Sequence, residues 1–197
     1  MIATTYSFET FSASENSKLG EKSTWTESMG RLIVPSMRLE QGEQLSFKEN
    51  CSASLIAKNG SSSAKFILTA WHCLENYSDI SQPIIFKIKD QDGKMLSRIA
   101  YRLSDGGGMH ADWAVLKLET EIKQSRVKPL ENIVLDAEIG ASVFIADFEA
   151  YHESSTDQLY PSFSRCKVTE ILKDVRLTNC KALKGKSGGP VMIKVKQ

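Results

Sequence analysis

The chain has 197 residues, 41% hydrophobic and 25% charged, which is typical of a globular protein of one domain or a pair of small ones. Its net charge is +1, from 25 basic and 24 acidic residues, which argues against a nucleic-acid-binding protein because these usually carry a basic face. No apolar run approaches the roughly 20 residues of a membrane span.

Residues 1–28 are rich in Ser, Thr and Glu, with Phe8, Phe11 and Trp25 scattered among them. The segment lacks the basic start and apolar core of a signal peptide. We expect a flexible leader or propeptide-like segment here. An ordered extra strand is the alternative.

Short apolar runs broken by turn residues follow, and they predict an all-β fold. Six strands are expected in the first part of the chain, at residues 31–34, 52–57, 65–69, 83–88, 96–103 and 114–118. After a connection containing proline, only four are expected, at residues 142–147, 166–172, 175–180 and 190–195. One short helix is expected at 131–139. Six strands suit a small closed barrel, whereas four close less easily.

The chain contains four cysteines: Cys51, Cys73, Cys166 and Cys180. None of them forms a Cys-x-x-Cys pair, so no structural zinc site is expected. Their spacing suggests two local disulfides. Residues 165–180 predict a hairpin that places Cys166 opposite Cys180, within bonding reach. Four free buried thiols are the alternative. Disulfides would indicate an oxidising compartment, the periplasm or the cell exterior, although no signal peptide is visible.

Two stretches of the first part carry candidate catalytic side chains. His72 ends a β-rich run, and a disulfide from Cys73 to Cys51 would fix the backbone beside it, as a general base requires. A lone histidine at a strand end is more often structural. Asp112 stands before the apolar strand 114–118, where a carboxylate can be a plain cap or can orient a histidine.

The third stretch is LKGKSGGPV, at residues 183–191. Its glycine turn can direct the N–H groups of Gly185 and Ser187 at a substrate oxygen, forming an oxyanion hole worth about 3–4 kcal/mol per donor. Gly188 and Gly189 leave room for another chain to approach.

The order His72, Asp112, Ser187, each beside a β segment, is that of the chymotrypsin-type catalytic triad. The sequence resembles the trypsin/chymotrypsin-like serine peptidases over about residues 29–195. CSASLI followed by ILTAWHC resembles the family's cysteine strand and histidine motif, ADWAVLKL its aspartate motif, and GKSGGPV its serine motif except at one position. SMGRLIVP and the bridged hairpin are closer to bacterial secreted members, including the glutamyl-endopeptidase type.

The resemblance implies a chymotrypsin-like double β-barrel. The first barrel would span residues 29–122, and the second, residues 123–197, would be truncated to about four of six strands. Family members continue beyond the serine motif with two more strands, so we expect a further C-terminal segment or a partner to complete this half. A four-stranded half-barrel would otherwise expose strand edges.

The resemblance also implies a serine endopeptidase acting on peptide or protein substrates, without metal or organic cofactor. Ser187 would be the nucleophile, His72 the general base and Asp112 the group that orients the base. The N–H groups of Gly185 and Ser187 would bind the oxyanion.

Two positions depart from the family pattern. Lys186 replaces the aspartate that commonly pairs with a new N-terminal amine, so we expect activation not to use that ion pair. Lys181 stands at the position that forms the base of the primary specificity pocket in the family, and the absence of Asp there argues against a preference for Lys or Arg. A cation there would favour acidic side chains, unless Lys181 points to solvent.

The sequence leaves two other functions open. A non-catalytic peptide- or protein-binding module on a protease scaffold is the main alternative, although the intact triad argues against it. A metal-binding protein using His72, His110, His152 and the cysteines is a weak third, because the spacing fits no usual ligand set.

Overall fold

The structure is a computed structural model, which describes residues 5–7, 24–79, 81–108, 110–130, 137–148, 161–173, 175–181 and 186–193. Strands dominate these residues: β1 (Thr5–Ser7), β2 (Met29–Glu40), β3 (Glu43–Ile56), β4 (Ser63–Thr69), β5 (Ile84–Lys89), β6 (Met95–Asp105), β7 (Ala114–Lys123), β8 (Ser142–Asp147), β9 (Ser162–Leu172), β10 (Val175–Thr178) and β11 (Val191–Ile193). Two short 3-10 helices, η1 (Thr24–Ser28) and η2 (Trp71–Leu74), accompany them.

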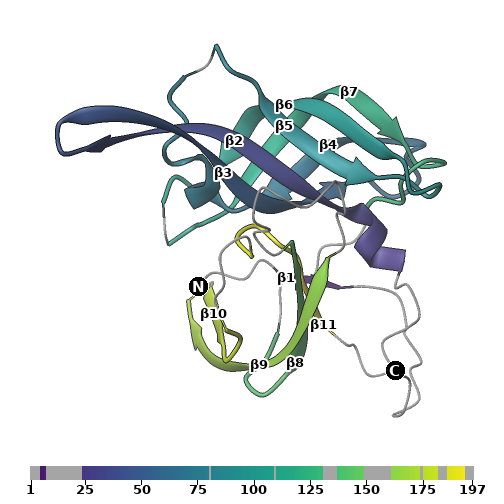
Figure 1. The fold of residues 1–197 in the computed structure, drawn as a ribbon. Coiled ribbons are helices and arrows are strands. Elements are labelled where there is room, and N and C mark those ends of the chain that lie inside the picture. Colours follow the sequence, from purple (N-terminus) through teal and green to yellow (C-terminus); the bar gives the residue numbers. More distant parts are fainter. Residues whose placement is uncertain are drawn as a thin grey trace.

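The first part of the chain closes into a barrel in the order β2–β3–β4–β7–β6–β5 (Figure 1). All six strands predicted there are confirmed. Side chains alternate between the interior and the outside: in β5, Ile84, Phe86 and Ile88 are buried, and the residues between them are only partly covered. Gly30 of β2 lies so close to the Phe86 ring that a Cβ would overlap it, so this position admits no side chain.

The second part forms a five-stranded sheet in the order β1–β11–β8–β9–β10, drawn below the barrel in Figure 1. Its last four strands in sequence are the four predicted from the second half. β1 pairs in parallel with β11, from Thr5 opposite Val191 to Ser7 opposite Ile193. Three residues of segment 1–28 therefore form an ordered strand on this sheet. The predicted helix lies mostly outside the described residues, and its last residues, 137–139, are not helical.

The barrel and the sheet pack against each other through apolar side chains and backbone pairing. One cluster joins Leu68 of the barrel to Met192 of the sheet and to Leu130 of the connection. The Leu130 N–H donates to the Leu55 carbonyl (2.9 Å), and the Ala57 N–H donates to the Leu130 carbonyl (3.0 Å). The connection between the two halves is thus itself held on β3.

Strands β2 and β3 continue far beyond the barrel as a two-stranded ribbon (Figure 1). Gln41 (φ 52°) and Gly42 (φ 86°) form its turn, with the positive φ values that a tight hairpin needs. The ribbon's outer residues are mostly charged or polar and exposed, which is why the sequence predicted only the buried parts of these strands. Among the described residues, no helix is long and apolar enough to cross a membrane.

A buried carboxylate directly follows strand β5. The Asp90 side chain is 2% exposed and pairs with Arg126 (Nη2 to Oδ2, 2.6 Å). It also accepts the N–H groups of Asp92 (3.1 Å) and Lys94 (2.8 Å) in the β5–β6 turn. The Arg126 hydrogen bond, above all, holds the pKa of Asp90 below its usual value, although burial acts in the opposite direction.

Replacing Asp90 with asparagine is expected to lower the free energy of unfolding by about 1–3 kcal/mol at pH 7. The pKa of Asp90 is lower in the folded chain than in the unfolded chain. Its contribution to the free energy of unfolding is therefore fully present at pH values above the unfolded pKa of about 3.9, and it is lost as the pH falls through the folded pKa. The difference from wild type should therefore shrink in acid. Urea titrations at pH 7 and in acid measure it, with Asp92→Asn on the exposed turn as control; an equal loss at both pH values would contradict this role.

Candidate active site

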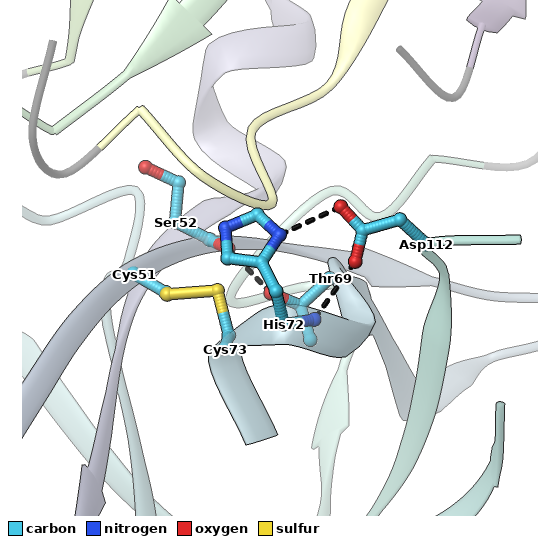
Figure 2. Close-up of polar contacts among 6 residues, drawn as sticks. All are labelled: Cys51, Ser52, Thr69, His72, Cys73 and Asp112. Atoms are coloured by element: carbon cyan, nitrogen blue, oxygen red, sulfur yellow. Dashed lines mark hydrogen bonds and ion pairs between the residues drawn. A yellow bond between two sulfur atoms is a disulfide. The ribbon is translucent and has the colours of Figure 1, made fainter. Parts of the chain in front are cut away.

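His72 lies on helix η2, directly after strand β4. Its neighbours Cys73 and Leu74 are buried in the barrel core, so they fix the helix while the imidazole faces outward. A disulfide joins Cys73 to Cys51 of β3, with the two Cα atoms 6.3 Å apart. Figure 2 shows His72 between this disulfide and Asp112. The histidine backbone is therefore held by core packing on one side and by a covalent link on the other.

His72 and Asp112 form a two-point contact (Figure 2). The imidazole Nδ1 lies 2.6 Å from Asp112 Oδ2, and the His72 backbone N–H donates to Oδ1 at 2.8 Å. Asp112 is 3% exposed, whereas the His72 side chain is 34% exposed. An ionised carboxylate only accepts, so Nδ1 carries the proton and Nε2 is left as an acceptor on the open side of the ring.

The electrostatic environment favours a protonated imidazole. The hydrogen bond that the imidazole donates to Asp112 raises the pKa of His72 above 6.5, and this outweighs partial burial, which lowers it. The negative charges of Asp112, Glu75 and Glu49 raise it further. The site therefore stabilises the imidazolium that a general base becomes during catalysis.

Asp112 is positioned by the segment before β7. The Gly106 N–H donates to the Trp113 carbonyl at 2.9 Å, and the Trp113 N–H donates to the Ala111 carbonyl at 2.8 Å. A Cβ at Gly106 would overlap the backbone of Ala111. The glycine-rich stretch at residues 106–108 is thus packed directly against the backbone that carries Asp112.

Ser187 occupies the corner of a tight turn, residues 186–189. The Gly189 N–H donates to the Lys186 carbonyl at 3.1 Å, and Gly188 has a φ of 78°. A positive φ confined to the third residue is the signature of a type II turn, which requires glycine there. The serine is the second residue of this turn, a position from which a side chain projects away from the backbone.

This serine turn, residues 186–189, lies on the barrel beside η2. The Ser52 N–H donates to the Ser187 carbonyl at 2.8 Å, and the Thr69 hydroxyl donates to the Ser52 carbonyl at 2.8 Å. A Cβ on Gly188 would overlap both Thr69 Oγ1 and the Ser52 carbonyl. Thr69 and Ser52 appear next to His72 in Figure 2. The backbone of Ser187 is therefore fixed on the two strands that also hold the histidine.

Of the three predicted triad residues, the structure joins His72 and Asp112 directly and fixes the backbone of Ser187 nearby. Within the described residues no side-chain hydrogen bond links Ser187 to His72; such contacts are often loose before substrate binds. Gly185, the other predicted oxyanion donor, lies outside the described residues. Lys181 is exposed.

The second predicted disulfide is also present. Cys166 bonds to Cys180 across the β9–β10 hairpin, with the Cα atoms 5.3 Å apart. Lys173, with a φ of 51°, lies in the turn of this hairpin, within the predicted residues 165–180. No cysteine of the described part is free, and no group of three or more possible metal ligands gathers there. His110 is exposed, and His152 lies outside the described residues.

Sequence reasoning missed the two residues that support the serine turn, Ser52 and Thr69. Ser52 is fully buried, and its hydroxyl accepts the Phe148 N–H at 3.0 Å, so it contacts the second sheet as well as the serine turn. The available signal was the alternation in CSASLI, where Ser52 and Ser54 interrupt a buried strand at every second position. Small polar side chains in that pattern indicate a strand face packed closely against other backbone.

Comparison with protein families gives a match over residues 51–194 to the trypsin-like peptidase domain. The chain belongs to the trypsin-like peptidase family. Its described architecture, a closed six-stranded barrel and a second sheet with four strands from the second half, is chymotrypsin-like with an incomplete second barrel, as the sequence predicted. The comparison with curated proteins gives no match.

Several solved structures share the fold of this trypsin-like peptidase chain. The protease Anisep from Arthrobacter nicotinovorans has a TM-score of 0.59 at 18% identity, covering 88% of this chain and 80% of that one. The thermostable serine protease AL20 from an extremophilic microorganism has a TM-score of 0.57 at 18% identity, covering 85% and 79%. An inactivated protease paralogue of the scabies mite has a TM-score of 0.56 at 16% identity, covering 85% and 77%. At these identities the likeness shows the fold alone.

Family membership and the site together support a peptidase-type protein. The two disulfides are compatible with an extracellular or periplasmic location. The same fold occurs in a protein described as a protease and in a paralogue described as inactivated, so the fold alone does not determine whether this chain is catalytic.

Proposed function

We propose that this chain is a serine endopeptidase that cleaves peptide bonds through Ser187, His72 and Asp112. The contact between His72 and the buried Asp112 carries the proposal. A merely structural histidine needs one partner for its ring. Here the carboxylate accepts from both the ring and the backbone N–H, which fixes the tautomer and the orientation of the imidazole together.

In the proposed reaction, Ser187 Oγ attacks the carbonyl carbon of the scissile peptide bond and passes its proton to His72 Nε2. The carbonyl oxygen becomes an oxyanion, which the N–H groups of Gly185 and Ser187 would stabilise. The intermediate collapses as the imidazolium gives its proton to the leaving amine, and an ester to Ser187 remains. Water then attacks this acyl-enzyme by the same route, releasing the acid and restoring the serine. No metal or organic cofactor enters this scheme.

Within the family, we propose that the chain is a secreted or periplasmic enzyme of the bacterial type, close to the glutamyl endopeptidases. The stretch at residues 28–35, the Cys166–Cys180 hairpin and the two disulfides support this. A preference for acidic residues would involve Lys181, which stands at the position that forms the base of the pocket in the family. The exposure of Lys181 equally suits the alternative that it faces solvent.

A fluorophosphonate probe tests the proposal. The purified wild-type chain should be labelled, peptide mapping should locate the adduct on Ser187, and Ser187→Ala should remain unlabelled. Ser97→Ala, on the exposed side of β6, is the matched control and should label like wild type. Circular dichroism confirms that each variant is folded.

Folded wild-type chain that resists labelling at high probe concentration would refute the proposal. Peptide binding by this unlabelled protein would then support the alternative, a non-catalytic binding module. Binding that survives in Ser187→Ala without turnover in wild type would support it further.

A further inference from the structure

The side chain of Lys186, the residue before the predicted nucleophile, reaches from the serine turn to the second sheet. Its Nζ donates to Ser164 Oγ of β9 at 2.8 Å. We propose that Lys186 is a positioning residue, which holds the serine turn in its catalytic conformation through Ser164. This inference rests on the proposed peptidase function and assigns a role to the residue that departs most clearly from the family's serine motif.

Each of the four residues of the serine turn contacts a different strand. Ser187 accepts from Ser52 of β3, Gly188 packs against Thr69 of β4, and Gly189 lies so close to the Ala146 carbonyl of β8 that a Cβ would overlap it. Lys186 adds the connection to β9. Of these contacts, the Lys186 hydrogen bond is the one made by a side chain of the turn itself.

The position of Lys186 in the turn gives this contact a catalytic consequence. Its carbonyl accepts the Gly189 N–H that closes the turn, and the peptide unit it shares with Ser187 carries one of the two predicted oxyanion donors. Rotation of that peptide would turn the Ser187 N–H away from the oxyanion. An anchor on Lys186 therefore acts chiefly on the transition state, in which the oxyanion develops, and little on bound substrate.

Both members of the pair suit this task. A lysine stem has four flexible carbons and a compact ammonium with three donors, so it needs an acceptor to become ordered. Ser164 is partly buried and lies within β9, where its pairing with Ile145 of β8 fixes its backbone. The anchor is internal to the chain. The serine turn can therefore be ordered without a new N-terminal amine, and activity should not require cleavage within residues 1–28.

Steady-state kinetics on a peptide substrate test the proposal. Lys186→Met, which keeps the stem but removes the donor, should lower kcat about tenfold to a hundredfold and leave KM within about twofold. Ser164→Ala should show the same pattern, and the double variant should lose no more than Lys186→Met alone. Lys186→Arg, which retains a donor, should recover part of kcat. Lys167→Met is the matched control, because Lys167 is an exposed lysine of β9, the strand that contains Ser164.

The outcomes separate this inference from the proposed function. Wild-type chain without fluorophosphonate labelling would refute the peptidase itself. An active wild type with unchanged kcat in both Lys186→Met and Ser164→Ala would refute the positioning role alone. A raised KM with unchanged kcat, or additive losses in the double variant, would also refute it. If Lys186→Met does not fold by circular dichroism, the milder Ser164→Ala decides.

Discussion

Replacing His72 with alanine is expected to lower kcat for peptide hydrolysis about a millionfold, the scale at which loss of the base alone disables a catalytic triad. Ser187 would then have no group to take its proton. The removed ring is also the partner of a carboxylate that is 3% exposed, so Asp112 would keep only its contact with the backbone N–H. Hydrolysis of a chromogenic peptide, at equal concentrations of folded wild-type and variant protein, measures the effect.

Two comparisons make the His72 result specific. His110→Ala removes a histidine that is exposed and close to Asp112 in sequence, and it should retain wild-type activity. The combined variant His72→Ala/Asp112→Asn should be no slower than His72→Ala, since the two side chains act as one unit. A His72→Ala variant that keeps more than about a hundredth of wild-type kcat would contradict the proposed base.

Replacing Asp112 with asparagine is expected to lower kcat about ten-thousandfold while preserving the fold. The amide nitrogen would donate to His72 Nδ1, which the carboxylate cannot do, so the ring proton would move to Nε2. A protonated Nε2 cannot accept from Ser187. The structure makes this effect severe because Nδ1 and Asp112 Oδ2 are only 2.6 Å apart in a buried setting, which leaves the ring little freedom to find another partner.

The same substitution should shift the pH profile in a defined direction. The pKa of His72 is raised above 6.5, chiefly by Asp112, and the base must be neutral to act. Wild-type kcat/KM should therefore rise with pH through this raised value. In Asp112→Asn the rise should move to lower pH, whereas Glu75→Gln should move it less in the same direction, because Glu75 acts only through its charge at a distance. A rise of kcat/KM that stays at the same pH or moves to higher pH in Asp112→Asn would contradict the assignment of this rise to His72.

The features that could be predicted from the sequence are those that depend on residues close together in the chain. Apolar residues alternate along β5, so the strand and its inward face followed from the pattern. Cys166 and Cys180 flank a short hairpin, and such closeness in sequence made their pairing predictable. His72 follows one apolar strand and Asp112 precedes another, and their resemblance to the family's histidine and aspartate motifs suggested the pair before any geometry was known.

The remaining features depend on contacts between segments that are distant in sequence. Ser52 supports Ser187 across more than half of the chain, and one serine among many gives no sign of such a contact. Lys186 showed only as a departure from a motif, and its bond to Ser164 depends on how β9 lies beside the turn. β1 pairs with β11, which lies near the other end of the chain, and nothing in either strand's sequence indicates that the two pair.

The Cys51–Cys73 disulfide makes the arrangement of Ser187 and His72 depend on the redox state of the surroundings. Cys51 precedes Ser52, which holds the backbone of Ser187, and Cys73 follows His72. One covalent bond thus joins the strand that holds Ser187 to the helix that carries His72. In a reducing cytosol such bonds do not persist, and β3 and η2 would be joined by noncovalent contacts alone. For the proposed peptidase, the alignment of Ser187 with His72 would therefore depend on an oxidising compartment.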